Sequence, residues 1–360
     1  MNPERFSPNQ FRHASSITHP GEFRDGRWHT FTPRAPVERI LLGRRWLLRP
    51  GLTFTPYANP TRCNAHCSFC SEELVRIDAT RLSAHTTITG YDRYFAALDR
   101  AWSELRGFEM GLSLSGLEAT SEPEWLLRLL SLLDAHGALF AERVLYTNGS
   151  GLANDERLVP ALARARFDRA EMSRAHFDEK VNLRIMRFDL GQPIRGTEVF
   201  RETVRRVQRE GVPVKLVCIL NTQGVSTIDD VERYLDEAEA IGVEHVVFRE
   251  LSVLGDIYRE NRETRWIAAH RAPVRALMDA LLDDQGRTRA GWTLEGVTSG
   301  YYYYNERYRR GRLQVTLEGS SYVAHRDAVE SGVLQKLVFH STRELCGDWV
   351  PNAQVIGCYD

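Results

Sequence analysis

Strand-like and helix-like segments alternate along the middle of this 360-residue chain, and the alternation limits the possible folds. Runs that predict strands lie at residues 52–57, 108–115, 143–146, 169–173, 214–220 and 245–251. Amphipathic stretches that predict helices lie between them, at 94–105, 125–133, 156–165, 197–210 and 228–241. This order predicts an α/β fold with a parallel sheet and right-handed crossovers. Six such units fit a doubly wound open sheet or an incomplete barrel, and both place the ligand site at the carboxyl ends of the strands.

The rest of the chain predicts extensions on this core. We expect an N-terminal extension at 1–48, the core at 49–255, and a C-terminal region at 256–360 that covers the mouth of the core. Within the last region we predict a helix at 265–282 and strands at 313–317 and 337–339. With 42% hydrophobic residues, 26% charged residues and a formal net charge of -1, the composition is globular and does not suggest a surface that binds nucleic acid. Residues 1–20 lack an apolar targeting segment, and no stretch has the length of a membrane span, so we expect a cytoplasmic protein without membrane contact.

Three cysteines form the main chemical motif. Cys63, Cys67 and Cys70 lie within eight residues, on the loop that leaves the first predicted strand. Three thiolates so close can bind three irons of a four-iron, four-sulfur cube and leave the fourth iron open, whereas an electron-transfer cluster uses four cysteines. A zinc site and a disulfide pair are the alternatives. Structural zinc requires four ligands, and the nearest further candidate, His66, lies inside the motif; disulfides suit oxidising compartments.

The motif Cys-x3-Cys-x2-Cys, with the aromatic Phe69 before its last cysteine, resembles the radical S-adenosylmethionine (SAM) superfamily. The resemblance implies a partial (β/α)6 barrel, a single [4Fe-4S] cluster on Cys63, Cys67 and Cys70, and SAM bound to the open iron. Reductive cleavage of SAM would then give a 5'-deoxyadenosyl radical, with electrons from a donor such as flavodoxin or ferredoxin. In this family the backbone of the residue at Phe69 meets the adenine.

The end of the second predicted strand resembles the family's Gly-Gly-Glu motif, which receives the methionine ammonium group. Ser115 stands in place of the first glycine, Gly116 follows it, and Leu117 is inserted before the acidic Glu118. By resemblance, Ser115, Gly116 and Glu118 would bind SAM. An ordinary strand-to-helix turn, for which Gly116 supplies the backbone freedom, is the alternative.

Further polar residues follow the next strands. By resemblance, Asn148 in Thr-Asn-Gly approaches the SAM pocket, Ser173 reaches the ribose, Arg174 the carboxylate, and Asn221 the ribose or adenine. The planar fork of an arginine suits a carboxylate. Each has a structural alternative: Asn-Gly is a common turn, the arginine can be solvated at a helix start, and polar residues are common at strand ends.

Three cysteines remain after the motif, too few for a second four-cysteine cluster. Cys218 lies in an apolar strand and fits packing, and Cys358 is close to the C-terminus. Cys346 is the candidate catalytic residue, because a cysteine can give a hydrogen atom to a product radical in some relatives. The alternative for Cys346 is a buried, unreactive thiol.

The substrate is the least constrained part of the prediction. Residues 301–312 combine four consecutive tyrosines, at 301–304, with four arginines. This segment either folds over the barrel mouth to bind an anionic or sugar-like substrate or forms an edge hairpin with its arginines in water. We expect hydrogen abstraction from a small polar metabolite, with a sugar or nucleoside in a biosynthetic pathway favoured, and decarboxylation, dehydration or epimerisation as outcomes. The alternatives are modification of a peptide or protein, and a non-enzymatic iron-sulfur or zinc protein. The sequence leaves the oligomeric state open.

Overall fold

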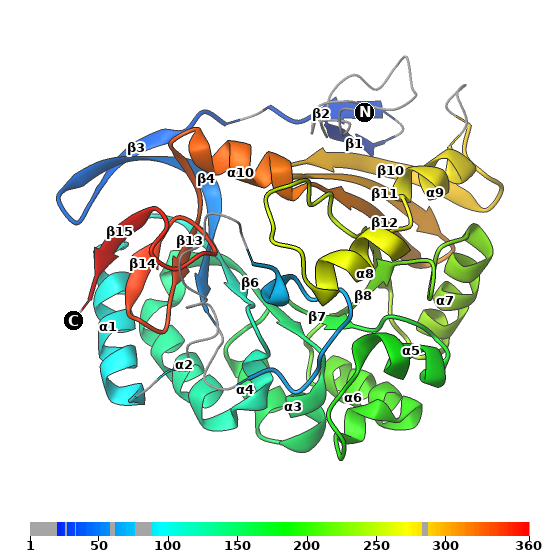
Figure 1. Ribbon diagram of the computed structural model, residues 1–360, viewed down its shortest axis with the longest axis horizontal. Coiled ribbons are helices and arrows are strands. Elements are labelled where there is room, and N and C mark those ends of the chain that lie inside the picture. The colour runs from blue at the N-terminus through cyan, green and yellow to red at the C-terminus, as the bar shows by residue number, and fades with distance from the viewer. Residues whose placement is uncertain are drawn as a thin grey trace.

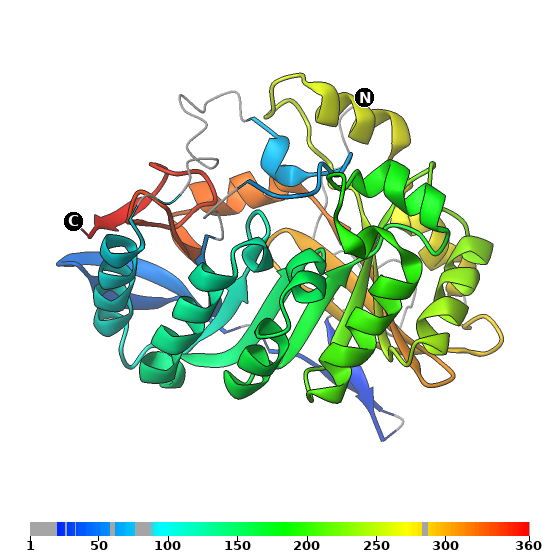
Figure 2. The same ribbon diagram turned by 90° about the horizontal axis from the view of Figure 1, so that it is seen from below.

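The computed structural model describes residues 20–25, 27–32, 34–57, 62–75, 88, 90–282 and 287–359, so residues 1–19 of the predicted N-terminal extension lie outside it. Six neighbouring parallel strands form its centre and confirm the predicted α/β core. They are β4 (Arg44–Pro56), β5 (Met110–Leu114), β6 (Phe140–Thr147), β7 (Arg169–Ser173), β8 (Val214–Leu220) and β9 (His245–Glu250). The sheet curves, with the crossover helices along its outer side (Figures 1 and 2).

The helices between these strands confirm most of the predicted pattern. They are α1 (Tyr91–Glu104), α2 (Pro123–His136), α3 (Ser150–Asn154), α4 (Leu158–Arg164), α5 (Glu179–Met186), α6 (Thr197–Arg209) and α7 (Ile228–Ala240). The short helices α3 and α5 were not predicted, because each spans too few residues to show a periodic apolar face. Both lie directly after a strand end, where they shape the loops.

The two faces of the parallel strands differ in chemistry. Side chains on the outer face are apolar and buried against the helices; examples are Phe54 against Trp102 of α1 and Phe248 against Tyr234 of α7. The register of the strands brings polar side chains together on the inner face: Thr53, Ser113, Tyr146, Glu171, Lys215 and Arg249. Glu171 is buried, Thr53 is exposed and the other four are half-buried, so the concave side of the sheet is polar and partly solvated.

The C-terminal region extends both edges of the core. After α8 (Arg262–His270) and α9 (Val274–Leu281), the antiparallel strands β10 (Trp292–Ser299), β11 (Tyr303–Arg310) and β12 (Leu313–Ser320) continue the sheet beside β9. Then α10 (Tyr322–Glu330) leads to β13 (Val333–Phe339), which pairs in parallel with β4, and to β14 (Glu344–Cys346) and β15 (Val355–Cys358). The predicted strands at 313–317 and 337–339 are therefore confirmed. The predicted helix at 265–282 is wrong, because Pro273 separates two helices.

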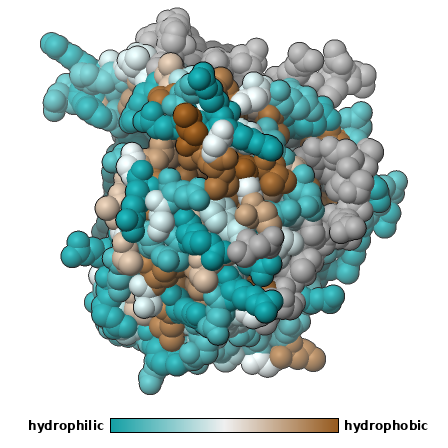
Figure 3. Space-filling model, turned by 90° about the vertical axis from the view of Figure 1, so that its left-hand side faces the viewer, coloured by the Kyte–Doolittle hydropathy of each residue, from teal (hydrophilic) through white to brown (hydrophobic). Residues whose placement is uncertain are grey.

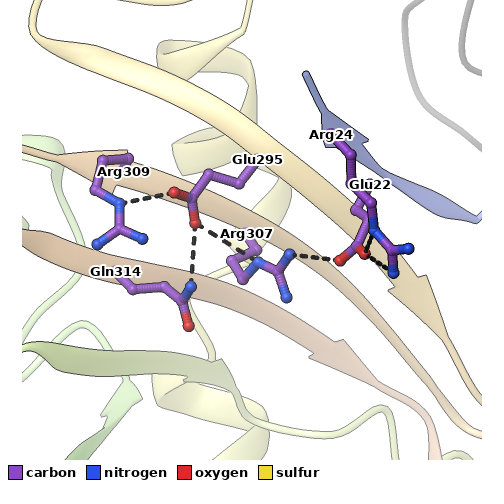
Figure 4. Close-up of polar contacts among 6 residues, drawn as sticks. All are labelled: Glu22, Arg24, Glu295, Arg307, Arg309 and Gln314. Atoms are coloured by element: carbon purple, nitrogen blue, oxygen red, sulfur yellow. Dashed lines mark hydrogen bonds and ion pairs between the residues drawn. The ribbon is translucent and has the colours of Figure 1, made fainter. Parts of the chain in front are cut away.

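The predicted edge hairpin with arginines in water is also wrong. Strand β11 pairs with β10 on one side and β12 on the other, so it lies inside the sheet. The arginines form ion pairs with acids: Glu295 accepts from Arg309 at 2.7 Å and lies 3.7 Å from Arg307, which also reaches Glu22 at 3.1 Å (Figure 4). Glu22 belongs to the hairpin of β1 (Gly21–Arg24) and β2 (Arg27–Thr30), and this ion-pair group fastens that hairpin to the sheet.

A second N-terminal element, β3 (Val37–Leu41), pairs with β4 and leaves apolar side chains in solvent. Ile40 is 67% exposed and Leu47 is 45% exposed. The face of the molecule that carries this hairpin shows hydrophobic side chains gathered in its upper half (Figure 3). Across the described part of the chain, every helix is too short or too polar to cross a membrane.

Candidate functional site

The cysteine loop leaves the carboxyl end of β4 and is held by backbone hydrogen bonds to the end of α5. The amide of His66 donates to the carbonyl of Arg187 at 3.1 Å, and the amide of Ser68 donates to that of Ile185 at 3.0 Å. The chain returns the contact, because the amide of Asp189 donates to Asn64 at 3.0 Å. Arg187 ends α5 in the left-handed region, with φ 49°, which turns its carbonyl group out of the helix. Backbone hydrogen bonds to the end of α5 therefore hold the cysteine loop in place.

The three motif thiols are partly buried and close enough to influence one another. Burial raises the pKa of Cys63 and of Cys70 to about 12, and it raises the pKa of Cys67 as well. Negative charge on Cys63 or Cys70 would raise the pKa of Cys67 further. A bound cation reverses this penalty, because a coordinating thiol is deprotonated by its metal. The donor set fits an iron-sulfur cluster, whose irons take cysteine thiolates.

The candidate fourth zinc ligand does not face these thiols. The His66 side chain is exposed, and its Nε2 atom lies 3.1 Å from Oδ1 of Asp189. Among the described residues, no three His, Cys, Asp or Glu side chains are placed to share one metal ion. The six cysteines, all within the described residues, form no disulfide.

Glu118 lies buried in the loop after β5, and its carboxylate already accepts four hydrogen bonds. Oε1 accepts from the amide of Thr120 at 3.1 Å and from the hydroxyls of Thr120 and Thr147 at 2.6 Å. Oε2 accepts from the amide of Asn148 at 2.6 Å. Desolvation raises the pKa of Glu118. The carboxylate thus ties the ends of β5 and β6 together, and Gly116 beside it has φ 120°, which glycine permits.

Asn148 joins the end of β6 to the cysteine loop. Its Nδ2 atom donates to Oδ1 of Asn64 at 3.0 Å and lies 3.8 Å from Sγ of Cys63, while its Oδ1 accepts from the amide of Ser150 at 2.9 Å. The hydroxyl of Ser150 also bonds to Asn64. Sequence reasoning missed Asn64 and Ser150. Their positions, one after a motif cysteine and one after an Asn-Gly turn, were the only available signal.

Ser173 and Arg174 lie on opposite sides of the sheet. Ser173 shares the inner face with Glu171 and is partly exposed at the carboxyl end of β7. Arg174 is buried in the helix layer, where its Nη2 donates to the hydroxyl of Thr197 at 3.0 Å and its guanidinium lies 4.7 Å from the Phe200 ring. Burial lowers the pKa of Arg174. Its described partners belong to α6 and not to the cysteine loop.

The remaining predicted residues are distributed more widely. Asn221 is buried and shapes its own turn, donating from Nδ2 to the Ile219 carbonyl at 2.9 Å and accepting from the Gln223 amide at 3.1 Å. Phe69 packs against the core. Ser115 lies 3.2 Å from Ser113 between hydroxyl oxygens on the inner face. Cys346 is buried on β14, where desolvation raises its pKa to about 12 and the nearby charges are Glu344, Asp348 and Cys358.

Sequence reasoning also missed a group of polar side chains beside the loop. Glu72, two residues after Cys70, accepts a hydrogen bond from the Tyr57 hydroxyl. The hydroxyl of Tyr322 faces Ser71. Lys336 completes this group from the inner face of β13, in register with Thr53. These residues come from segments separated by more than two hundred positions, so no local motif could reveal them.

No family model and no curated protein matches the chain. Solved structures that resemble it include SuiB from Streptococcus suis bound to precursor peptide SuiA, at 12% identity and a TM-score of 0.47 over 84% of this chain and 60% of that one. Coproporphyrinogen III oxidase from Escherichia coli, a radical SAM enzyme, is 14% identical with a TM-score of 0.40, over 72% of this chain and 67% of that one. A radical SAM methyltransferase from Sphaerobacter thermophilus is 16% identical with a TM-score of 0.40, over 64% of each chain.

The chain spans half of anSMEcpe, solved with bound AdoMet, and about three fifths of SuiB. At these identities and TM-scores, the substrate and reaction of this chain must be inferred from its own residues.

Proposed function

We propose that the chain is a radical SAM enzyme that binds one [4Fe-4S] cluster through Cys63, Cys67 and Cys70 and abstracts a hydrogen atom from a small polar metabolite. The observation that carries this proposal is the cysteine loop itself, fixed at the carboxyl end of β4 and contacted by Asn148 from the end of β6. When bound, the cluster and SAM supply electron transfer and cleavage of SAM to methionine and a 5'-deoxyadenosyl radical. A flavodoxin or ferredoxin would supply the electron.

The chain's own residues position this chemistry. Asn148 directs an amide N–H toward Cys63, and such donors to cluster sulfurs tune the reduction potential. Glu118 holds Asn148 in place through its backbone amide. Ser115 and Ser173 remain on the inner face, where their hydroxyl groups can bind SAM or substrate.

The polar inner face suits a small polar substrate better than an apolar substrate. The half-buried hydroxyl groups of Ser113 and Ser173 and the half-buried ammonium group of Lys215 offer donors and acceptors to a sugar or nucleoside. Cys346 is proposed as the hydrogen donor to the product radical. Its test is the Cys346→Ala variant, in which substrate should be consumed while the product with the returned hydrogen atom fails to form.

The test of the function is anaerobic reconstitution with iron and sulfide, reduction with dithionite, and chromatography for 5'-deoxyadenosine formed from SAM. We expect about four irons per chain and formation of 5'-deoxyadenosine. Cys67→Ala should lose both, whereas the control Cys358→Ala, an exposed thiol on β15, should keep both. One zinc per chain, or cleavage of SAM that persists in Cys67→Ala, would overturn the proposal.

A further inference from the structure

Lys336 is a buried ammonium group without an anionic partner. The residue is 4% exposed and lies on the inner face of β13. Its Nζ atom lies 4.2 Å from the ring centroid of Trp349 and 5.9 Å from that of Tyr302. Among the described residues, no carboxylate forms an ion pair with it and no acceptor forms a hydrogen bond to it.

An ammonium group in this position needs compensation. Removing a charge from water is costly unless it is paired or hydrogen-bonded, and aromatic faces offset part of that cost. Burial lowers the pKa of Lys336 to about 7. The three N–H bonds of the ammonium can satisfy acceptors that the chain itself does not provide.

The acids near Lys336 bond to other groups. Glu72 accepts from the Tyr57 hydroxyl, and Oδ1 of Asp348 accepts from the Trp349 amide at 2.6 Å. Both lie close enough to raise the pKa of Lys336 without pairing with it. On the same inner face, Arg249 pairs with Glu318 and Lys215 lies 3.6 Å from Glu171. Lys336 is thus the cation of this face that is left without a paired carboxylate among the described residues.

The location of Lys336 connects it to the candidate site. Glu72 follows Cys70 on η1 (Ser71–Glu73), and Tyr57 precedes the cysteine loop. The Tyr57 ring lies 6.3 Å from Trp349, the residue that covers Lys336. A molecule bonded to Lys336 would therefore lie beside the residues that flank the cysteine loop.

We propose that Lys336 binds an oxyanion, a carboxylate or phosphate, on the substrate, with the rings of Trp349 and Tyr302 near the ammonium group. The identification of the anion as part of the substrate rests on the proposed function. The anion site itself is inferred from the contacts of Lys336 alone. It restricts the metabolite to one that carries an anionic group and a polar or aromatic body. Formation of the Lys336 contact orients that body on the inner face.

The test uses the three lysines of the sequence, Lys180, Lys215 and Lys336. The full chain, labelled with ¹⁵N at lysine side chains, is titrated with inorganic phosphate or acetate at constant ionic strength, with chloride as the control anion. We expect the Lys336 resonance to shift with saturation, while those of the exposed Lys180 and the ion-paired Lys215 do not. Assignment comes from the loss of one resonance in Lys336→Met.

Lys336→Met should also weaken phosphate binding by about tenfold or more, followed by tryptophan fluorescence, and Lys336→Arg should restore part of it. No shift of Lys336, or equal shifts of all three lysines, would overturn the inference. If Lys336→Met fails to fold, Lys180→Arg and Lys215→Arg assign the remaining resonance to Lys336 by elimination. Neither iron nor SAM is needed. Anion binding without cluster assembly would overturn the proposed function alone, and SAM cleavage without a Lys336 shift would overturn this inference alone.

Discussion

At the scale of single residues, the site depends on amide and carboxylate groups that hold the cysteine loop. Asn148 is the residue that contacts both a motif cysteine and the neighbouring Asn64. Groups that hydrogen-bond to metal ligands orient them and affect how tightly the metal is held. Side chains of this kind therefore control cluster retention without binding iron.

We expect Asn148→Ala to weaken iron retention by about 10- to 100-fold, because the substitution removes the side-chain amide that donates to Cys63 and Asn64. The measurement is the rate of iron loss to a chelator from the reconstituted chain. Asn154→Ala is the matched control, since Asn154 bonds to Gln192 on the surface at 3.1 Å. Equal rates of iron loss in the two variants would show that Asn148 does not help to hold the cluster.

A buried histidine gives the fold a specific pH response. Desolvation lowers the pKa of His340 from 6.5 to about 4. In the unfolded chain His340 takes up a proton near pH 6.5, whereas in the folded chain it stays neutral until about pH 4. The stabilisation that neutral His340 gives to the fold is therefore fully present above pH 6.5 and is lost as pH falls toward 4. The loss amounts to about 3 kcal/mol as an order of magnitude.

The measurement for His340 is the free energy of unfolding in urea between pH 7 and pH 4. The unmutated chain should lose more stability over this window than His340→Gln, which cannot titrate. Parallel curves for the two proteins would contradict the buried, neutral state of His340.

At the scale of elements, the sequence predicted the strands well, because each combines apolar runs with a turn signal at its carboxyl end. Strand β7 was predicted with its observed bounds, Arg169–Ser173, and β8 with Val214–Leu220. Strand β11 was misjudged because its alternating tyrosines and arginines suggested an edge. Its arginines are satisfied by Glu295 and by Glu22, and only the folded sheet brings the N-terminal hairpin to that place (Figure 4).

The turn between β6 and α3 is the element that places Asn148. Gly149 has φ 83°, and a Cβ atom there would lie 2.8 Å from Cε of Met172. Gly149→Ala therefore combines backbone strain with a clash, and we expect a loss of about 1–3 kcal/mol in unfolding free energy together with lower iron content. Gly211→Ala is the control, because Gly211 has φ 82° with nothing within 4 Å of the added atom.

The comparison of the two glycine variants separates the two costs. Strain alone should be similar in both, so the excess loss in Gly149→Ala reports the contact with Met172. Equal losses, with unchanged iron content in both variants, would show that this turn does not control the site.

At the scale of the whole molecule, a strand of the C-terminal region pairs with the strand that leads into the cysteine loop. Strand β13 pairs with β4, and the Tyr57 amide donates to the Phe339 carbonyl at 2.9 Å. The sequence indicated a strand at 337–339 but could not indicate its partner, because pairing over such a separation leaves no local signal. For the same reason the polar group around Lys336 was not predicted, whereas the cysteine motif, complete within eight residues, was.

This pairing makes the cysteine loop sensitive to the C-terminal region. Leu337 is fully buried on the face of β13 opposite Lys336, so Leu337→Ala should cost about 2–5 kcal/mol. Weaker pairing of β13 should also loosen the segment that leads into the loop, and hydrogen exchange of the Tyr57 and His66 amides should become faster. Leu190→Ala, at a residue 89% exposed, is the control and should leave both quantities unchanged. If Leu337→Ala lowers stability while exchange at Tyr57 and His66 keeps its original rate, the C-terminal strand supports the sheet without restraining the cysteine loop.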